Sequence, residues 1–88
     1  MTIEITHPND EEIEEKGVLS WPIWTCEISE FEWEYGESES CYLLDGEVEV
    51  QSEFETVSFS AGNFVVFPKG LKCSWKVTRP VRKHYKFS

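Results

Sequence analysis

Apolar and polar residues alternate along most of the chain beyond residue 21, with the period of two that is typical of half-buried β-strands. The pattern is clearest in EFEWEY at 30–35, where three aromatic residues share one face and three glutamates share the other. Further strand-like segments lie at 3–5, 21–28, 40–44, 47–51, 55–59, 63–67, 72–77 and 81–87. The eight segments from residue 21 onward, at this regular spacing, predict an all-β fold, either a small β-barrel or a double-sheet jelly roll.

One short helix is predicted near the N-terminus, in HPNDEEIEEKG at 7–17. Asn9 is a suitable N-cap residue, and Glu12 stands three residues further along, as in a capping box. Acidic residues fill the first turn, where they face the positive end of the helix dipole. Gly17 is the expected end of this helix.

Several short breaks separate the strand-like segments of the second half of the chain. Asp45-Gly46 separates 40–44 from 47–51, and this dipeptide between strands predicts a tight two-residue hairpin. Thr78-Arg79-Pro80 separates the last two segments. The segments on either side of Asp45-Gly46, and those on either side of Thr78-Arg79-Pro80, are therefore predicted to be separate strands.

Alternation places several chemically active side chains on the inward faces of the predicted strands. An unpaired carboxylate inside an apolar barrel is costly, so Glu39 is expected to have a partner such as Lys83 or the Tyr35 hydroxyl. His84 is expected to point outward, and Trp21 and Trp24 are expected to cover a barrel end or a dimer contact. The inward candidates are Trp33, Tyr35, Glu39, Cys41, Cys73, Trp75 and Lys83.

The charges divide the chain into an acidic and a basic part. The 88 residues carry a net charge of −9, with all 17 acidic residues between Glu4 and Glu55 and seven of the eight basic residues from Lys69 onward. Because the basic residues are interleaved with apolar ones, we expect basic C-terminal strands to pair with acidic N-terminal strands. The net negative field would repel phosphates, which argues against a nucleic-acid partner.

Length and cysteine usage set further limits. A chain of 88 residues is expected to form one domain, 1–88, with a single modest core. Three widely spaced cysteines without a CxxC motif favour the cytoplasm or another reducing intracellular compartment. No apolar run approaches the length of a membrane span, and the first residues do not resemble a signal peptide. We therefore expect no membrane partner.

Two stretches resemble the two halves of the cupin signature. Glu39 and Gly46 have the spacing of the glutamate and glycine in the first motif. GNFVVFPKGLKC matches the second motif at Gly62, Pro68 and Gly70. Together with WPIW and WKVTRPVRKHY, these stretches make the chain similar to small single-domain cupins related to ureidoglycine aminohydrolase. The resemblance implies a cupin-type jelly-roll barrel, a homodimer, and a ligand site inside the barrel.

The resemblance also identifies the positions at which a typical cupin binds its metal through three histidines and one glutamate. The histidine positions are occupied here by Trp33, Tyr35 and Cys73, and the glutamate position by Glu39. An indole offers no lone pair to a metal, and imidazole is the ligand that suits transition metals. We therefore expect no resident cofactor. If a divalent transition metal binds, Glu39 and Cys73 are its expected ligands.

Three hypotheses for the function follow from these residues. The first is binding of a small polar ligand in a pocket lined by Trp33, Tyr35, Cys41, Cys73 and Trp75. The second is an enzyme of the ureidoglycine aminohydrolase-like or isomerase type, with a metal or with Glu39 and Lys83 as an acid–base pair. The third is a non-catalytic scaffold whose pocket is vestigial, which a barrel filled completely beside Glu39 would favour.

Overall fold

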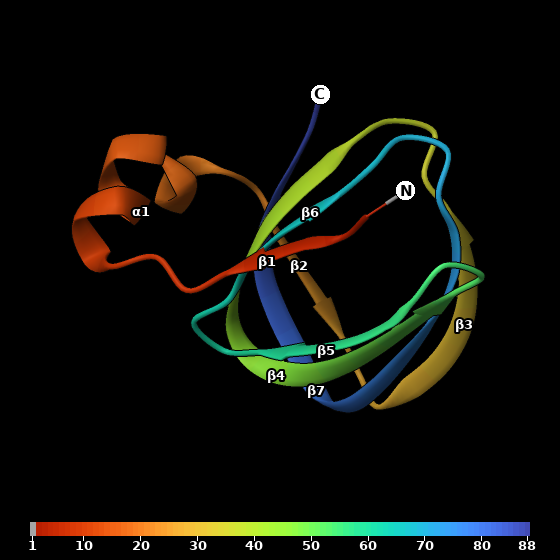
Figure 1. Ribbon diagram of the computed structural model, residues 1–88. Coiled ribbons are helices and arrows are strands. Elements are labelled where there is room, and N and C mark those ends of the chain that lie inside the picture. The colour runs from red at the N-terminus through yellow and green to blue at the C-terminus, as the bar shows by residue number, and fades with distance from the viewer. Residues whose placement is uncertain (1) are drawn as a thin grey trace.

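Antiparallel strands curl into a barrel, and a short helical segment lies against its outside (Figure 1). The computed structural model describes residues 2–88. The elements are β1 (Glu4–Thr6), α1 (Asp10–Lys16), the 3₁₀ helix η1 (Val18–Ser20), β2 (Ile23–Cys26), β3 (Ser29–Glu34), β4 (Glu39–Ser52), β5 (Thr56–Ser60), β6 (Phe64–Phe67) and β7 (Lys72–Phe87). This arrangement confirms the predicted all-β class with one short N-terminal α-helix.

Helix α1 begins and ends where the sequence predicts. The backbone N–H of Glu12 donates to Asn9 Oδ1 at 2.9 Å, and the N–H of Asn9 donates to Glu12 Oε1 at 3.3 Å, which completes the capping box. Gly17 ends the helix in the left-handed conformation, with φ at 68°. Ile13 packs with Phe64 in a small cluster outside the main core. With seven residues in α1, the described part of the chain has no helix long and apolar enough to cross a membrane.

The predicted hairpin at Asp45-Gly46 is wrong, because β4 runs through it as a single strand of 14 residues. The pairing of β4 with β7 shifts register around Gly46, as in a β-bulge. Inward positions are 39, 41 and 43 before the bulge, and 48 and 50 after it. Gly46 has φ at 107°, and a Cβ there would lie 2.6 Å from the Pro80 oxygen and 2.8 Å from Val81 Cα. The glycine is therefore required by the close approach of two bent strands.

The last two predicted strands also form a single strand, β7, of 16 residues. Thr78-Arg79-Pro80 lies within β7, at the bend where it crosses the bulge of β4. The first half of β7 pairs with β3, and its second half pairs with β2. Strand β7 therefore lies beside β3 along its first half and beside β2 along its second half, and inward side chains of both halves lie in the same barrel interior.

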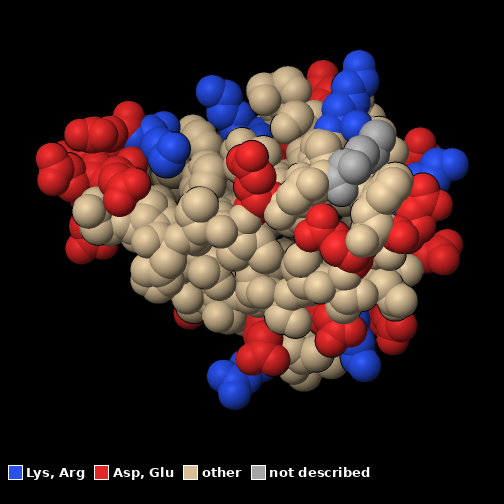
Figure 2. Space-filling model, in the orientation of Figure 1, with Lys and Arg blue, Asp and Glu red and all other residues tan. Residues whose placement is uncertain are grey.

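Charged side chains pair across the strands as expected. Lys76 of β7 lies opposite Glu30 of β3 on one side and Glu49 of β4 on the other. Arg82 Nε donates to Asp45 Oδ2 at 3.0 Å. Other acidic side chains have no such partner strand within residues 2–88: Figure 2 shows them gathered over α1, at the left of the view. The basic C-terminal strand thus offsets part of the acidic charge of its neighbours.

Candidate functional site

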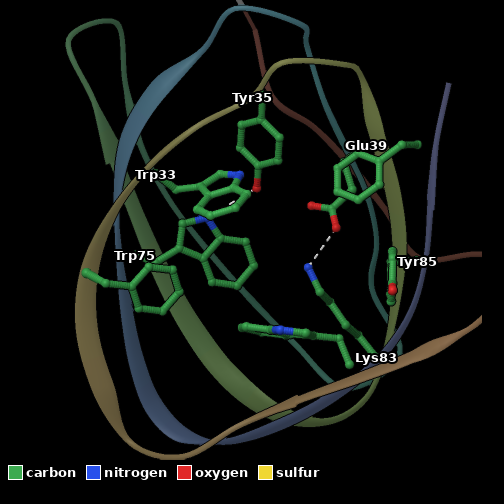
Figure 3. Close-up of a pocket in the computed structure, with 9 residues that line it drawn as sticks. Trp33, Tyr35, Glu39, Trp75, Lys83 and Tyr85 are labelled. Atoms are coloured by element: carbon green, nitrogen blue, oxygen red, sulfur yellow. Dashed lines mark hydrogen bonds and ion pairs between the residues drawn. The ribbon is translucent and has the colours of Figure 1, made fainter.

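A cavity of about 260 Å³ lies inside the barrel, beside Glu39 (Figure 3). This volume is slightly below the usual range of ligand pockets, roughly 300–1,000 Å³, and therefore suits only a small molecule. The residues that line it are Trp24, Phe31, Trp33, Tyr35, Glu39, Trp75, Lys83, Tyr85 and Phe87. Aromatic walls around one carboxylate and one ammonium group are the main feature of this cavity.

The two charged residues of the cavity form a buried ion pair. Lys83 Nζ donates to Glu39 Oε2 at 2.9 Å, and each residue is only 4% exposed. Glu39 is the first residue of β4, and Lys83 lies on β7 opposite Leu43 of the same β4 strand. The structure therefore brings together the two residues that alternation assigns to one interior. A buried pair at this distance is expected to be strongly coupled, because water screens it poorly.

Two indole rings complete the surroundings of the Lys83 ammonium group. Its Nζ lies 4.8 Å from the ring centroid of Trp24 and 4.6 Å from that of Trp75. Both distances are within the range of cation–π attraction. Trp24 is placed there by β2, where it stands directly opposite Lys83. The ammonium group therefore faces a carboxylate and two π-faces, all supplied by the chain itself.

Tyr35 contributes a neutral hydroxyl group to the cavity. It is buried, its ring stacks on Phe67 with centroids 4.8 Å apart, and its hydroxyl oxygen accepts a hydrogen bond from Trp75 Nε1 at 3.2 Å. Burial raises the pKa of Tyr35 far above its usual value, and the charge of Glu39 adds to this shift. The phenol therefore stays protonated, and its hydroxyl group can donate a hydrogen bond to an acceptor in the cavity.

Glu39 retains one carboxylate oxygen that the chain does not use. Lys83 occupies Oε2, and no side chain or backbone group among residues 2–88 donates a hydrogen bond to Oε1. Every fully buried side-chain nitrogen or oxygen in this part of the chain has a partner. Oε1 is therefore not fully buried, and it opens on the cavity that Glu39 lines. The cavity thus offers one strong acceptor and, from Tyr35, one donor.

The structure places neither of the two predicted pocket cysteines in the wall of this cavity. Cys41 is completely buried in the core, and burial raises the pKa of its thiol to about 12. Cys73 donates through Sγ to the Trp33 carbonyl at 3.7 Å and borders a second groove, which shares Trp33 with the cavity. Burial also raises the pKa of Cys73. Cys41 is therefore part of the packed core and Cys73 borders the groove, and neither thiol lines the cavity.

Four residues of the cavity were not among the sequence-predicted site residues: Trp24, Phe31, Tyr85 and Phe87. Three of them belong to the alternating inward sets of β3 and β7, so the period of two contained the signal for them. Trp24 was expected at a barrel end, and its position opposite Lys83 required the pairing of β2 with β7. Trp33, at 49% exposure, is half open to solvent and forms part of the rim.

His84 points away from the cavity, as expected, but it is buried and not exposed to solvent. The residue is only 6% exposed. Nδ1 of His84 lies 2.8 Å from the carbonyl oxygen of Trp21, which follows η1. The outer face of β7 is covered here by this helical segment, which alternation along β7 alone does not reveal.

The donor set does not fit a resident divalent metal. Of the cupin ligand positions, Trp33 has no lone pair to offer, Tyr35 remains a protonated phenol, and Cys73 has a raised thiol pKa. Residues 2–88 contain no group of three or more His, Cys, Asp or Glu side chains that could hold a metal ion. At Glu39, the positive charge is supplied by the Lys83 ammonium group.

The antiparallel barrel with an interior cavity has the architecture of a cupin, and comparison with known proteins identifies the family. Residues 13–85 match the family described as EutQ-like cupin domain, so the chain belongs to this cupin family. Among curated proteins, no sequence matches the chain.

Solved structures confirm the cupin jelly roll. A DUF861 family protein from Thermotoga maritima is 46% identical, with 99% of this chain and 100% of that chain covered and a TM-score of 0.96. The EutQ protein of Clostridium difficile is 26% identical over 74% of this chain and 52% of that chain, with a TM-score of 0.68. A putative ethanolamine utilization protein Q from Salmonella typhimurium, at 22% identity and a TM-score of 0.67, covers 99% of this chain and 69% of that chain and supports the fold alone. These matches support the cupin family, and the closer relation to ureidoglycine aminohydrolase stays a prediction.

Proposed function

We propose that this cupin binds a small polar ligand in the cavity at Glu39 and does so without a resident metal ion. The observation that supports this most strongly is the Glu39–Lys83 pair, which is buried in an aromatic cavity and leaves Glu39 Oε1 open. Aromatic walls with a few convergent polar groups are the usual composition of a ligand pocket. The ammonium group takes the place of a metal as the counter-charge of Glu39.

A purely structural role explains these residues less well. Replacing a buried ion pair by apolar residues of similar volume is often neutral or stabilising, so the fold alone does not require Glu39 and Lys83. Protein interiors are normally close-packed, and a vestigial pocket would be expected to fill with side chains. A cavity instead lies directly beside the charged pair. This combination supports ligand binding over the scaffold hypothesis.

An enzyme that transfers protons is the second candidate, as in the aminohydrolase-like or isomerase-type hypothesis. A carboxylate and an ammonium group that share a hydrogen bond at 2.9 Å can serve as base and acid for a bound ligand. Turnover separates the two candidates. A ligand that binds the protein unchanged over hours supports binding alone, whereas conversion that is lost in Glu39→Gln, with binding retained, supports the enzyme.

A small-molecule fragment screen with two matched variants tests the proposed function. Trp33 lines the cavity and is 49% exposed, whereas Phe54 is a comparably exposed aromatic residue outside it. An aromatic contact contributes roughly 0.5–1.5 kcal/mol, so Trp33→Ala should weaken the best fragment by about 2- to 12-fold. Phe54→Ala should leave its affinity unchanged. Equal effects of the two substitutions, or no fragment that binds, would overturn the proposal.

A further inference from the structure

The surroundings of the Lys83 ammonium group make it a poor binding site for an anion. One N–H is directed at Glu39 Oε2, and the group is flanked by the π-faces of Trp24 and Trp75. The positive charge is therefore already stabilised by one hydrogen bond to a carboxylate and by two cation–π contacts. A ligand anion would have to displace one of them and would also meet the carboxylate of Glu39. The cavity therefore disfavours anions.

Cations are disfavoured for the complementary reason. The aromatic cage that would attract a cation is already filled by the Lys83 ammonium group, which lies 2.9 Å from the carboxylate. A second cation at Glu39 would lie close to this ammonium group in a poorly screened interior. Because a ligand of either charge meets a like charge, the cavity favours a neutral ligand.

Two polar groups of the cavity remain available to a ligand, and together they fit a ligand that carries a hydrogen-bond donor next to an acceptor. Glu39 Oε1 can accept a hydrogen bond, and the Tyr35 hydroxyl, which accepts from Trp75, still has its own proton to donate. Both side chains point into the same cavity from its upper part in Figure 3. A ligand that pairs with both presents an N–H group and a carbonyl oxygen on neighbouring atoms, as a cyclic amide does.

The walls favour a flat ring for the body of this ligand. Phe31 and Trp75 stack on each other, with centroids 6.0 Å apart and an interplanar angle of 14°, and Trp24 meets both rings edge-on, so this part of the wall consists of flat aromatic rings. Planar rings gain most from such offset-stacked and edge contacts. Resting on the proposed function, we propose that the pocket binds a small, neutral, planar cyclic amide, whose N–H donates to Glu39 Oε1 and whose carbonyl accepts from Tyr35.

The test uses 2-pyridone, which is a planar neutral cyclic amide, and follows the indole N–H signals of the four tryptophans by NMR. Trp24, Trp33 and Trp75 line the cavity, whereas Trp21 packs on Phe64 outside it. The signals of the first three should shift with 2-pyridone, and the Trp21 signal should not. Trp21 therefore serves as an internal control for non-specific effects.

Matched analogues test which groups the pocket recognises. N-Methyl-2-pyridone lacks the N–H donor and should bind at least about tenfold more weakly, because a hydrogen bond to a charged acceptor is lost. 4-Methyl-2-pyridone keeps the donor and has the same size, so it should bind like 2-pyridone. Benzoate and benzamidinium represent planar anions and cations, and both should bind more weakly.

Three results would overturn the proposed ligand class. The first is equal binding of the N-methyl and 4-methyl compounds, and the second is tighter binding of benzoate or benzamidinium to the same three tryptophans. In both cases the pocket binds a ligand, so the proposed function stands while the cyclic amide fails. The third is the absence of any shift with all five compounds. The fragment screen, which does not depend on this compound class, then judges the proposed function separately.

Discussion

Lys83→Met removes the ammonium group that pairs with Glu39 while keeping a long, flexible, apolar side chain between the two indoles. The lost contacts are the 2.9 Å hydrogen bond to Glu39 Oε2 and the cation–π contacts with Trp24 and Trp75. The thioether can still pack against the aromatic rings. The main consequence of the substitution is therefore a carboxylate without a counter-charge in an interior where Glu39 is 4% exposed.

The size of this effect follows from two limits. Removing one partner of a buried ion pair costs about 3–5 kcal/mol. The stranded group can escape this cost by taking up a proton. Since an ordinary glutamate has a pKa of about 4.3, protonating such a group at pH 7 costs about 3.7 kcal/mol. We therefore expect Lys83→Met to lower the free energy of unfolding by about 3–4 kcal/mol at pH 7.

Acidification should reduce the difference between the variant and the native protein. In the variant, the stranded carboxyl group binds its proton more tightly in the folded than in the unfolded state. The stability of the variant relative to the native protein therefore decreases as pH rises and increases as pH falls. At pH 5 the cost of protonating an ordinary glutamate is only about 1 kcal/mol, so most of the deficit should disappear.

Urea unfolding at pH 7 and pH 5, followed by tryptophan fluorescence, measures both effects. Lys76→Met is the matched control, because Lys76 is an exposed lysine of the same strand, opposite Glu30 and Glu49. Its expected cost is below about 0.5 kcal/mol. The double variant Glu39→Gln/Lys83→Met should recover more than half of the loss. A cost for Lys83→Met no larger than that of the control, or one independent of pH, would refute the buried-pair reasoning.

Gly46→Ala combines a strained φ, which costs about 1–3 kcal/mol, with a backbone clash, so it should destabilise the fold by at least this amount in the same unfolding assay. Gly36→Ala should be nearly neutral, because no atom lies within 4 Å of the added Cβ. Equal effects would contradict the bulge. A thiol reagent at pH 8 should label Cys26 alone in the folded protein, since burial raises the pKa of Cys41 to about 12 and also raises that of Cys73. Labelling of all three would contradict this burial. Light scattering should give the mass of a homodimer, and a monomer mass would exclude that expectation.

Local pattern was sufficient to predict the strand class, the inward faces and the helix caps. A period of two and a capping box are properties of neighbouring residues, so they do not depend on the rest of the fold. Glu39 and Lys83, 44 residues apart, were assigned to one interior in this way. The alternation of β7 also contained Tyr85 and Phe87, which the structure places in the cavity wall.

Features that depend on long-range pairing were not predictable in the same way. Asp45-Gly46 has the composition of a hairpin turn, but its backbone is fixed by the crossing of β4 and β7, which alternation along one strand cannot describe. Alternation gives the face of a residue and not its level in the barrel, so Cys41 and Cys73 were placed in the pocket and Trp24 was not. His84 is buried by η1, an element distant in sequence.

Elemental analysis of the purified protein tests most directly whether the Glu39 pocket operates without a metal. If the Lys83 ammonium group supplies the counter-charge of Glu39, the protein should contain a transition metal only in substoichiometric amounts. Added Zn²⁺, Mn²⁺ or Ni²⁺ should then leave its thermal stability unchanged, because a ligand stabilises a fold only by binding its native state. One equivalent of bound metal that is lost in Glu39→Gln would contradict the metal-free pocket.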